Sequence, residues 1–209
     1  MIEAVGGLPL TGNEEGLIPA FGLYLTRHYA SYYNEVSFAY LHAAEERGEA
    51  ALATAKASLI EAGHICAFNT FGGIMLSQEW EAVVGPMLDS REDWVHGIVA
   101  VVNALGWGRW QVESLTADEE LHISIPNSYE SAGYLKTHGQ SPLGPVCMLA
   151  TGGVAGIMNL IYHGDILAKP GLTDAYYDEL FGSAGGFGGE EIACRAHGAA
   201  RCEVVARRR

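Results

Sequence analysis

The sequence predicts an α+β protein, in which four antiparallel strands form a sheet packed with helices and a helical N-terminal region precedes it. Three observations carry this prediction. Apolar residues recur at three- and four-residue steps through much of the N-terminal half, whereas residues 110–115 and 120–125 alternate between apolar and polar side chains. Near the C-terminus, Cys194 and Cys202 flank Gly198, which indicates a hairpin that brings both cysteines to one end of two paired strands.

Composition supports a compact globular protein. Of the 209 residues, 49% are hydrophobic and 18% are charged, so the chain can bury a sizeable core. The net charge of −13 argues against direct nucleic-acid binding, and the basic residues 207–209 are interpreted as a solvated chain end. No run reaches the roughly 18 apolar residues of a membrane span, and residues 1–9 lack a cationic leader pattern, so we expect a cytoplasmic protein.

The first elements in the chain are expected to be helices. Residues 1–18 contain glycines and prolines without a period and are interpreted as a loose arm. Residues 19–47 are expected to form one long helix. Its predicted apolar face consists of Phe21, Leu25, Tyr29, Tyr32, Val36, Tyr40 and Ala43. Gly48 ends this helix, and residues 49–62 form a second one with Gly63 at its C′ position.

Two further helical stretches complete the N-terminal half. Residues 64–84 form the first, loosened at Gly72 and Gly73, and residues 90–105 form the second, with Ser90 or Asp93 as its cap. We therefore predict a helical N-terminal extension over residues 1–89 and a ligand-binding domain over residues 90–209. The helices of the extension can cover the second domain, form a dimer face or enlarge a pocket. Tyrosines at 24, 29, 32, 33 and 40, with His28, serve either packing or a polar-aromatic site.

The second half alternates strands and helices. After the strands at 110–115 and 120–125, Ser128 caps a short helix over residues 129–136. Residues 145–162 are apolar and small, so we expect a buried helix whose glycines admit a neighbouring backbone. A short helix over 173–181 follows. The glycine-rich residues 182–189 lack the Lys-Ser/Thr of a phosphate loop and are interpreted as a flexible connection that can act as a lid.

Thiols and a carboxylate gather around the final hairpin. Glu191 precedes Cys194 by three residues, and a third cysteine arriving from elsewhere would complete four ligands for a tetrahedral metal. The alternative is a pair of partly buried thiols without metal. Arg195, His197 and Arg201 can offset the negative charge of a metal–thiolate group. Cys66 is interpreted as a core cysteine.

Residues 90–206 resemble the 4-vinyl reductase domain family, also called the hydrocarbon-binding domain, which is similar to TRAPP-type and haem-NO-binding folds. The resemblance is carried by Leu105-Gly-Trp-Gly before a strand, Asn127-Ser-Tyr-Glu after one, Pro145-Val-Cys at the start of the glycine-bearing helix, and Glu191-x2-Cys194-x7-Cys202. The zinc-containing sensor domain of phenol-responsive regulators carries equivalent motifs. The resemblance therefore implies a structural zinc held by Cys147, Glu191, Cys194 and Cys202.

The same resemblance implies a cavity between helices and sheet for a small hydrophobic or aromatic molecule. The expected lining residues are Trp94, Asn103, Trp107, Ile125, Tyr129 and Met148. Asn103 and Ile125 stand where the phenol sensors place a histidine and a tryptophan, so a ligand other than phenol is implied. The predicted function is thus a zinc-containing ligand-binding or sensor protein, acting as a homodimer.

The alternative function is an enzyme that uses the same cavity. The resemblance then implies a vinyl-reductase-like reductase or an aminothiazoline-carboxylate-hydrolase-like hydrolase that acts on a small biosynthetic intermediate. Candidate polar groups, without assigned roles, are Asn103, His122, Asn127, Tyr129, Glu130 and His163.

Overall fold

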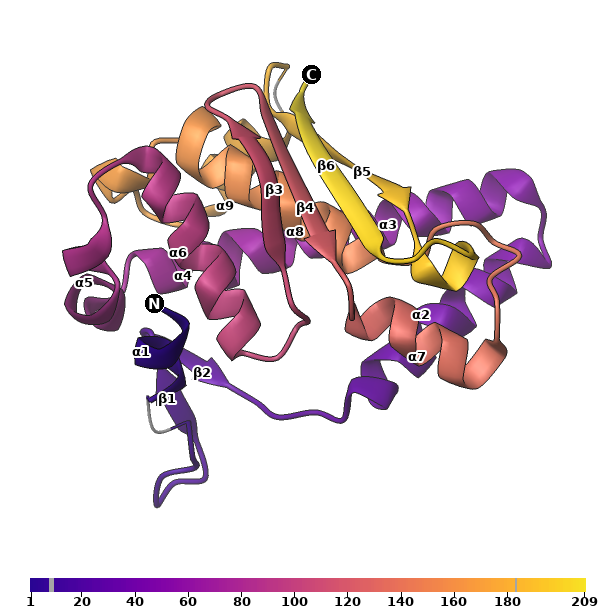
Figure 1. Cartoon of the computed structure of the whole chain (residues 1–209), viewed down its shortest axis with the longest axis horizontal. Coiled ribbons are helices and arrows are strands. Elements are labelled where there is room, and N and C mark those ends of the chain that lie inside the picture. The colour runs from indigo at the N-terminus through magenta and orange to yellow at the C-terminus, as the bar shows by residue number, and fades with distance from the viewer. Residues whose placement is uncertain (8–9, 183) are drawn as a thin grey trace.

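A computed structural model describes residues 1–7, 10–182 and 184–209, apart from the side chain of Ile2. It confirms the predicted α+β class, with a four-stranded antiparallel sheet in the order β3-β4-β6-β5 (Figure 1). The four strands are β3 (Gln111–Thr116), β4 (Glu120–Ile125), β5 (Phe187–Ala193) and β6 (Cys202–Arg208). Cys202 pairs with Ile125 at one end of β6, and the hairpin turns through a left-handed Gly198 with φ 96°.

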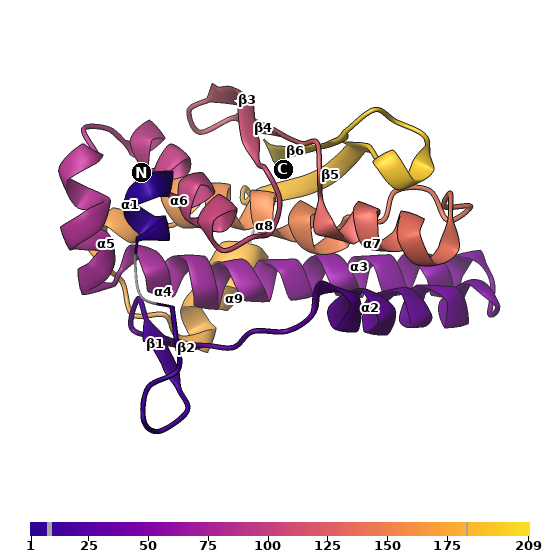
Figure 2. The same cartoon turned by 60° about the horizontal axis from the view of Figure 1, so that its bottom comes forward.

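Helices lie in layers on one face of this sheet. The longer helices are α2 (Ala30–Glu45), α3 (Glu49–Cys66), α6 (Arg91–Ala104), α7 (Tyr129–His138), α8 (Met148–Met158) and α9 (Asp174–Gly182). The shorter ones are α1 (Ile2–Gly6), α4 (Gly72–Met75) and α5 (Gln78–Val83). Helix α8 lies between the sheet and α3, and α2 lies outside α3 (Figure 2). No helix in the described ranges is long and apolar enough to cross a membrane.

Helix α8 is buried along its whole length, as the small apolar residues 145–162 predicted. It crosses α3 at two glycines. A Cβ atom on Gly152 would lie 2.1 Å from the Ile60 carbonyl oxygen, and one on Gly63 would lie 2.6 Å from the Leu149 carbonyl oxygen. The expected helix end at Gly63 is therefore wrong, because this glycine is needed inside α3 for backbone contact. Helix α3 continues into the π-helical turn η1 (Ala67–Phe71), and α8 continues likewise into η3 (Asn159–His163).

The N-terminal arm is more ordered than its composition predicted. Helix α1 packs against α6, and Val5 is fully buried. The expected helix over 19–47 begins only at Ala30, because β1 (Ile18–Ala20) and β2 (Leu23–Leu25) form a hairpin. Both residues between these strands, Phe21 and Gly22, have positive φ, as a tight hairpin turn requires.

Helix α2 also turns the unexpected face inward. Its buried residues are Asn34, Ser37, Phe38, Leu41 and Ala44, whereas most of the predicted apolar face is exposed. Phe38 packs edge-on against Tyr134 of α7, with ring centroids 4.8 Å apart. The contact with α7 therefore decides which face of α2 is buried.

The glycine-rich residues 186–189 form the start of the packed strand β5 and the residue directly before it. A Cβ atom on Gly189 would lie 2.3 Å from the Thr151 carbonyl oxygen of α8, so glycine lets β5 approach this helix. Buried Asn159 also clamps the strand, donating to the Phe187 carbonyl at 3.0 Å and accepting from the Phe187 N–H at 2.7 Å. The predicted flexible connection is wrong over these residues, and its Ser183 lies outside the described residues.

Helix α6 begins with a reciprocal cap. Ser90 Oγ accepts from the Asp93 N–H at 3.2 Å, and Asp93 Oδ2 accepts from the Ser90 N–H at 2.8 Å. We expect Ser90→Ala to lower the free energy of unfolding by about 1 kcal/mol, because the first turn loses its acceptor. Urea unfolding measures this change. Ser58→Ala, at an exposed position inside α3, is the control, and an equal loss there would contradict the capping assignment.

Candidate ligand cavity and metal centre

Three cysteines and one glutamate converge where α8 meets the last two strands. Cys147 precedes α8, Glu191 lies on β5, Cys194 follows β5 and Cys202 opens β6. The four candidate ligand atoms lie within 4.8 Å of one another. The sulfurs of Cys147 and Cys202 are 3.5 Å apart, close to the ~3.7 Å edge of a tetrahedron with ~2.3 Å metal–sulfur bonds. The cluster can hold a metal ion.

Burial of the cluster favours a cation. Cys147 and Cys202 are fully buried, and Glu191 is 8% exposed. Glu191 Oε2 accepts from the Cys147 N–H at 2.7 Å, but among the described residues its buried Oε1 has no hydrogen-bond partner. Burial raises the pKa of Glu191 to about 8. It is also the largest cause that holds the pKa of Cys147 well above its usual value. A divalent cation would reverse both shifts and satisfy the unpaired oxygen, so these residues fit zinc.

Lys56 is a cationic residue near the cluster that the sequence analysis did not single out. Lys56 of α3 donates to the Leu143 carbonyl, and its pKa is lowered by burial, with Glu191 and Cys194 opposing this shift. Arg201 instead pairs with Glu203 and Glu113 on the outer face of the sheet. The offset that we expected from Arg201 is therefore wrong, and the acidic partners of this arginine explain why.

Glu130 supports the cluster indirectly. This buried carboxylate accepts from the N–H groups of Leu149 and Ala150, both at 3.0 Å, and so caps the first turn of α8. Burial raises the pKa of Glu130 to about 8, against the lowering effect of these two hydrogen bonds. Its role is to hold the N-terminus of the helix that carries Cys147.

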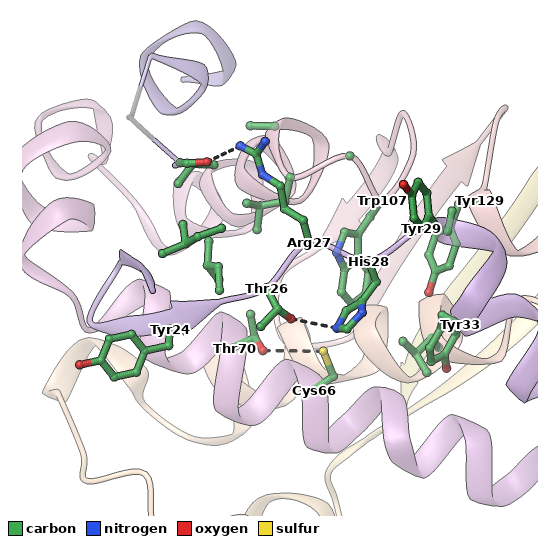
Figure 3. A pocket seen from close by; sticks show the side chains of 18 of the residues that line it. Tyr24, Thr26, Arg27, His28, Tyr29, Tyr33, Cys66, Thr70, Trp107 and Tyr129 are labelled. Atoms are coloured by element: carbon green, nitrogen blue, oxygen red, sulfur yellow. Dashed lines mark hydrogen bonds between the residues drawn. The ribbon is translucent and has the colours of Figure 1, made fainter. Parts of the chain in front are cut away.

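A cavity of about 880 Å³ lies beside α3, at the junction of the N-terminal segment with α6 and α7 (Figure 3). Its walls come from residues 24–33, from α3 and η1, from the loop that follows α6, and from the starts of α7 and α8. The lining side chains used below are Thr26, His28, Tyr33, Cys66, Thr70, Trp107 and Tyr129.

Aromatic rings form one wall of the cavity. Trp107 and Tyr129 meet edge-on with centroids 6.2 Å apart, and Tyr33 lies 6.0 Å from Tyr129. Burial raises the pKa of Tyr33 to about 12 and holds the pKa of Tyr129 well above its usual value. The hydroxyl groups of both tyrosines therefore stay neutral and can donate hydrogen bonds at physiological pH.

A smaller polar wall faces these rings. Thr26 Oγ1 and His28 Nε2 lie 3.0 Å apart, and Cys66 Sγ lies 3.7 Å from Thr70 Oγ1. Burial raises the pKa of Cys66, so this thiol is a neutral side chain and a poor nucleophile. Cys66 thus lines a cavity and is only partly buried, which corrects its interpretation as a core cysteine.

The predicted lining residues are distributed unevenly. Trp107 and Tyr129 line the cavity. Trp94 packs against Trp80 with centroids 5.4 Å apart, and Asn103 holds the backbone of Trp110 through both ends of its amide. Ile125 and Met148 are buried in the core. The ligand-binding role of the predicted set stays a prediction.

The polar groups suggested for an enzyme are also dispersed. Among them, Tyr129 is the one that belongs to the described lining of the cavity. His122 pairs with Glu203 at 3.0 Å on the sheet, and Asn127 Oδ1 accepts from the Arg109 N–H at 2.6 Å. Several cavity residues were not among the predicted lining residues. The sequence did point to some of them through the group of tyrosines with His28. From that group, the cavity is lined by Tyr24, His28, Tyr29 and Tyr33.

Comparison with solved structures identifies a known protein domain with a similar fold. No protein-family model matches the chain, and no curated protein matches its sequence. Among solved structures, the phenol-responsive sensory domain of the transcription activator PoxR, crystallised with phenol, is similar at a TM-score of 0.63 and 12% identity. The similarity covers 93% of this chain and 82% of that domain. The fold is therefore that of a known sensory domain, whereas membership of the 4-vinyl reductase family stays a prediction.

Proposed function

We propose that this protein binds a small aromatic molecule in the cavity beside Trp107 and Tyr129, as a sensor or carrier, and holds a structural zinc ion in its cysteine–glutamate cluster. The observation that carries the proposal is the cavity of about 880 Å³, a size that suits small-molecule sites. The structural likeness to a sensory domain crystallised with phenol supports it. A cytoplasmic location and a homodimeric assembly complete the proposal and stay predictions.

The chemistry of the two walls defines the ligand class. The rings of Trp107, Tyr33 and Tyr129 favour a flat aromatic body. The Thr26–His28 pair offers hydrogen-bonding groups to a polar edge of such a molecule. Phenol fills little of this volume. In the family arrangement, Asn103 would have to contact a phenol hydroxyl. Here its amide instead bonds to the backbone of Trp110. A molecule with two fused rings suits the site better.

The zinc ion has a separate task in the proposal. Cys147, Glu191, Cys194 and Cys202 would hold it, and four protein ligands make a closed, structural site. When bound, the ion would offset two of the four negative charges of its ligands and leave a net charge of about −2. It thereby links the start of α8 to β5 and β6. Since Leu149 of α8 also lines the cavity, the cluster supports one of the cavity walls.

Titration of the protein with phenol, indole and 1-naphthol tests the binding proposal. We expect saturable quenching of tryptophan fluorescence, with 1-naphthol binding at least about tenfold more tightly than phenol because its second ring buries further apolar surface. Cys66→Phe, which fills the cavity, should weaken 1-naphthol binding by at least about tenfold. Trp94→Phe, at a tryptophan that packs against Trp80, is the control and should leave it unchanged. The proposal fails if none of the three compounds saturates, or if Cys66→Phe binds 1-naphthol as well as the parent protein does.

A further inference from the structure

The cavity beside Trp107 differs in charge from the rest of the chain. The protein has 25 aspartates and glutamates against 12 lysines and arginines, which gives a net charge of −13. None of the described residues that line the cavity, however, is an aspartate or a glutamate. The lining side chains that can carry a positive charge are Arg27 and His28. The lining therefore has the opposite charge balance to the chain as a whole.

Arg27 keeps most of its hydrogen-bonding groups available. Its Nη2 donates to the Leu10 carbonyl oxygen, which leaves further N–H donors on the guanidinium (Figure 3). No carboxylate in the described ranges pairs with this side chain. By contrast, Arg91, Arg201 and Arg207 each form an ion pair with an acidic side chain. Arg27 thus has the free charge and the planar donors that a carboxylate group accepts.

The nearby tyrosines add neutral donors to this wall of the cavity. The hydroxyl groups of Tyr33 and Tyr129 stay protonated, because burial raises the pKa of both side chains. The carboxylate next to them in the chain, that of Glu130, does not line the cavity. It accepts from the N–H groups of Leu149 and Ala150 at the start of α8. An anion in the cavity would therefore meet hydrogen-bond donors and no facing carboxylate among the described residues.

Helix ends make a smaller contribution to the field in the cavity. Ala30 begins α2 and Tyr129 begins α7, and both residues line the cavity. Within the described ranges, neither helix has a side-chain cap at its start. The positive end of a helix dipole favours an anion by about 0.3–1 kcal/mol. Because the last residue of α6, Ala104, also lines the cavity, its negative end opposes this effect, and the full charge of Arg27 decides the sign.

We infer that the ligand of this cavity is an aromatic acid, whose rings pack against Trp107 and Tyr129 and whose carboxylate is bound by Arg27. The inference rests on the proposed ligand-binding function and narrows the class of ligand from aromatic molecules to aromatic anions. The Thr26–His28 pair is then left for a second polar group of the same molecule. A neutral phenol or hydrocarbon would leave the Arg27 charge unused.

Calorimetric titration of the full chain with 1-naphthoate and 1-naphthamide tests the inference. The two compounds have the same rings and nearly the same shape, but only the first carries a negative charge. We expect 1-naphthoate to bind at least about tenfold more tightly, because a guanidinium binds a carboxylate more strongly than a neutral amide. The net charge of −13 repels an anion at long range, so such a preference can come only from groups at the cavity.

Arg27→Gln should weaken binding of 1-naphthoate by at least about tenfold and change binding of 1-naphthamide by less than about twofold. Arg27 also holds the Leu10 carbonyl, so a variant that merely loosened the cavity wall would weaken both compounds alike. Arg27→Lys keeps the charge and should lie between the parent protein and Arg27→Gln. Arg47→Gln is the matched control, because it removes the same charge from an exposed residue outside the cavity lining. It should leave binding of both compounds unchanged.

Three results would each overturn the inference. The first is equal or tighter binding of 1-naphthamide by the parent protein. The second is an equal loss of both compounds in Arg27→Gln, and the third is a loss of the preference in Arg47→Gln as large as in Arg27→Gln. If 1-naphthol still binds saturably in these cases, the proposed function stands and only the assignment of an anionic ligand fails. If none of the naphthyl compounds binds, both proposals fail.

Discussion

Replacement of Cys202 by serine is expected to abolish stoichiometric zinc binding and to lower the free energy of unfolding by at least about 3 kcal/mol. Structural zinc contributes on the order of 10 kcal/mol to the folding of small domains, and a hydroxyl is a poor substitute for a thiolate ligand. The loss also leaves the buried Glu191 carboxylate without its cation, and no described residue donates a hydrogen bond to its Oε1. The zinc content of the purified protein and its urea unfolding curve measure the two effects.

Cys66→Ser is the matched control for this experiment. Cys66 is the one cysteine outside the cluster, so this variant should keep one zinc ion per chain. A chelator added to the parent protein should reproduce the instability of Cys202→Ser, and zinc should reverse it. The zinc assignment would be wrong if the parent protein, purified from zinc-containing medium, were fully folded and metal-free.

Gly152→Ala is expected to destabilise the protein by at least about 3 kcal/mol, although alanine is favoured over glycine in helices by about 1 kcal/mol. The added Cβ would lie 2.1 Å from the Ile60 carbonyl oxygen and 2.8 Å from the Gly63 Cα. Both are backbone atoms, so no side-chain rotation can relieve the overlap. Helices α3 and α8 must separate, which disturbs the wall of the cavity at Leu149 and the start of α8 at Cys147.

The neighbouring glycine provides the control. A Cβ on Gly153 would meet the side chain of Trp110 at 3.4 Å, which is an ordinary contact. Gly153→Ala should therefore change the free energy of unfolding by less than about 1 kcal/mol. Denaturant unfolding of the two variants, measured side by side, separates backbone contact from simple helix propensity. Equal effects at the two positions would argue against a close crossing at Gly152.

Much of the candidate metal centre was predictable because its signals are local. Cys194 and Cys202 flank a turn that needs Gly198, and paired strands bring the ends of a hairpin together whatever surrounds them. The alternation of residues 120–125 likewise identified β4, and Ser90 with Asp93 identified the start of α6. Cys147 came from a resemblance in motifs, because neither hairpin geometry nor spacing brings residue 147 to residue 202.

The cavity was less predictable, because its walls come from segments that are distant in the sequence. Trp107 and Tyr129 were expected, but His28, Cys66 and Thr70 meet them only after α3 and the N-terminal segment have packed. The polar wall has no sequence motif of its own. Periodicity identifies a face of a helix, and it carries no information on which distant segment that face meets.

By itself, the sequence determined the α+β class, the four strands of the main sheet, the glycine-bearing helix and the thiol hairpin, because periods, caps and turns act over a few residues. Only the tertiary structure decided where α2 begins, which of its faces is buried, and why Gly63 lies inside a helix. Each of these depends on a contact across the chain: α2 with α7 through Phe38 and Tyr134, and α3 with α8 through Gly63 and Gly152. Such contacts exist only when several elements have packed, and the energies of close packing then outweigh local preference.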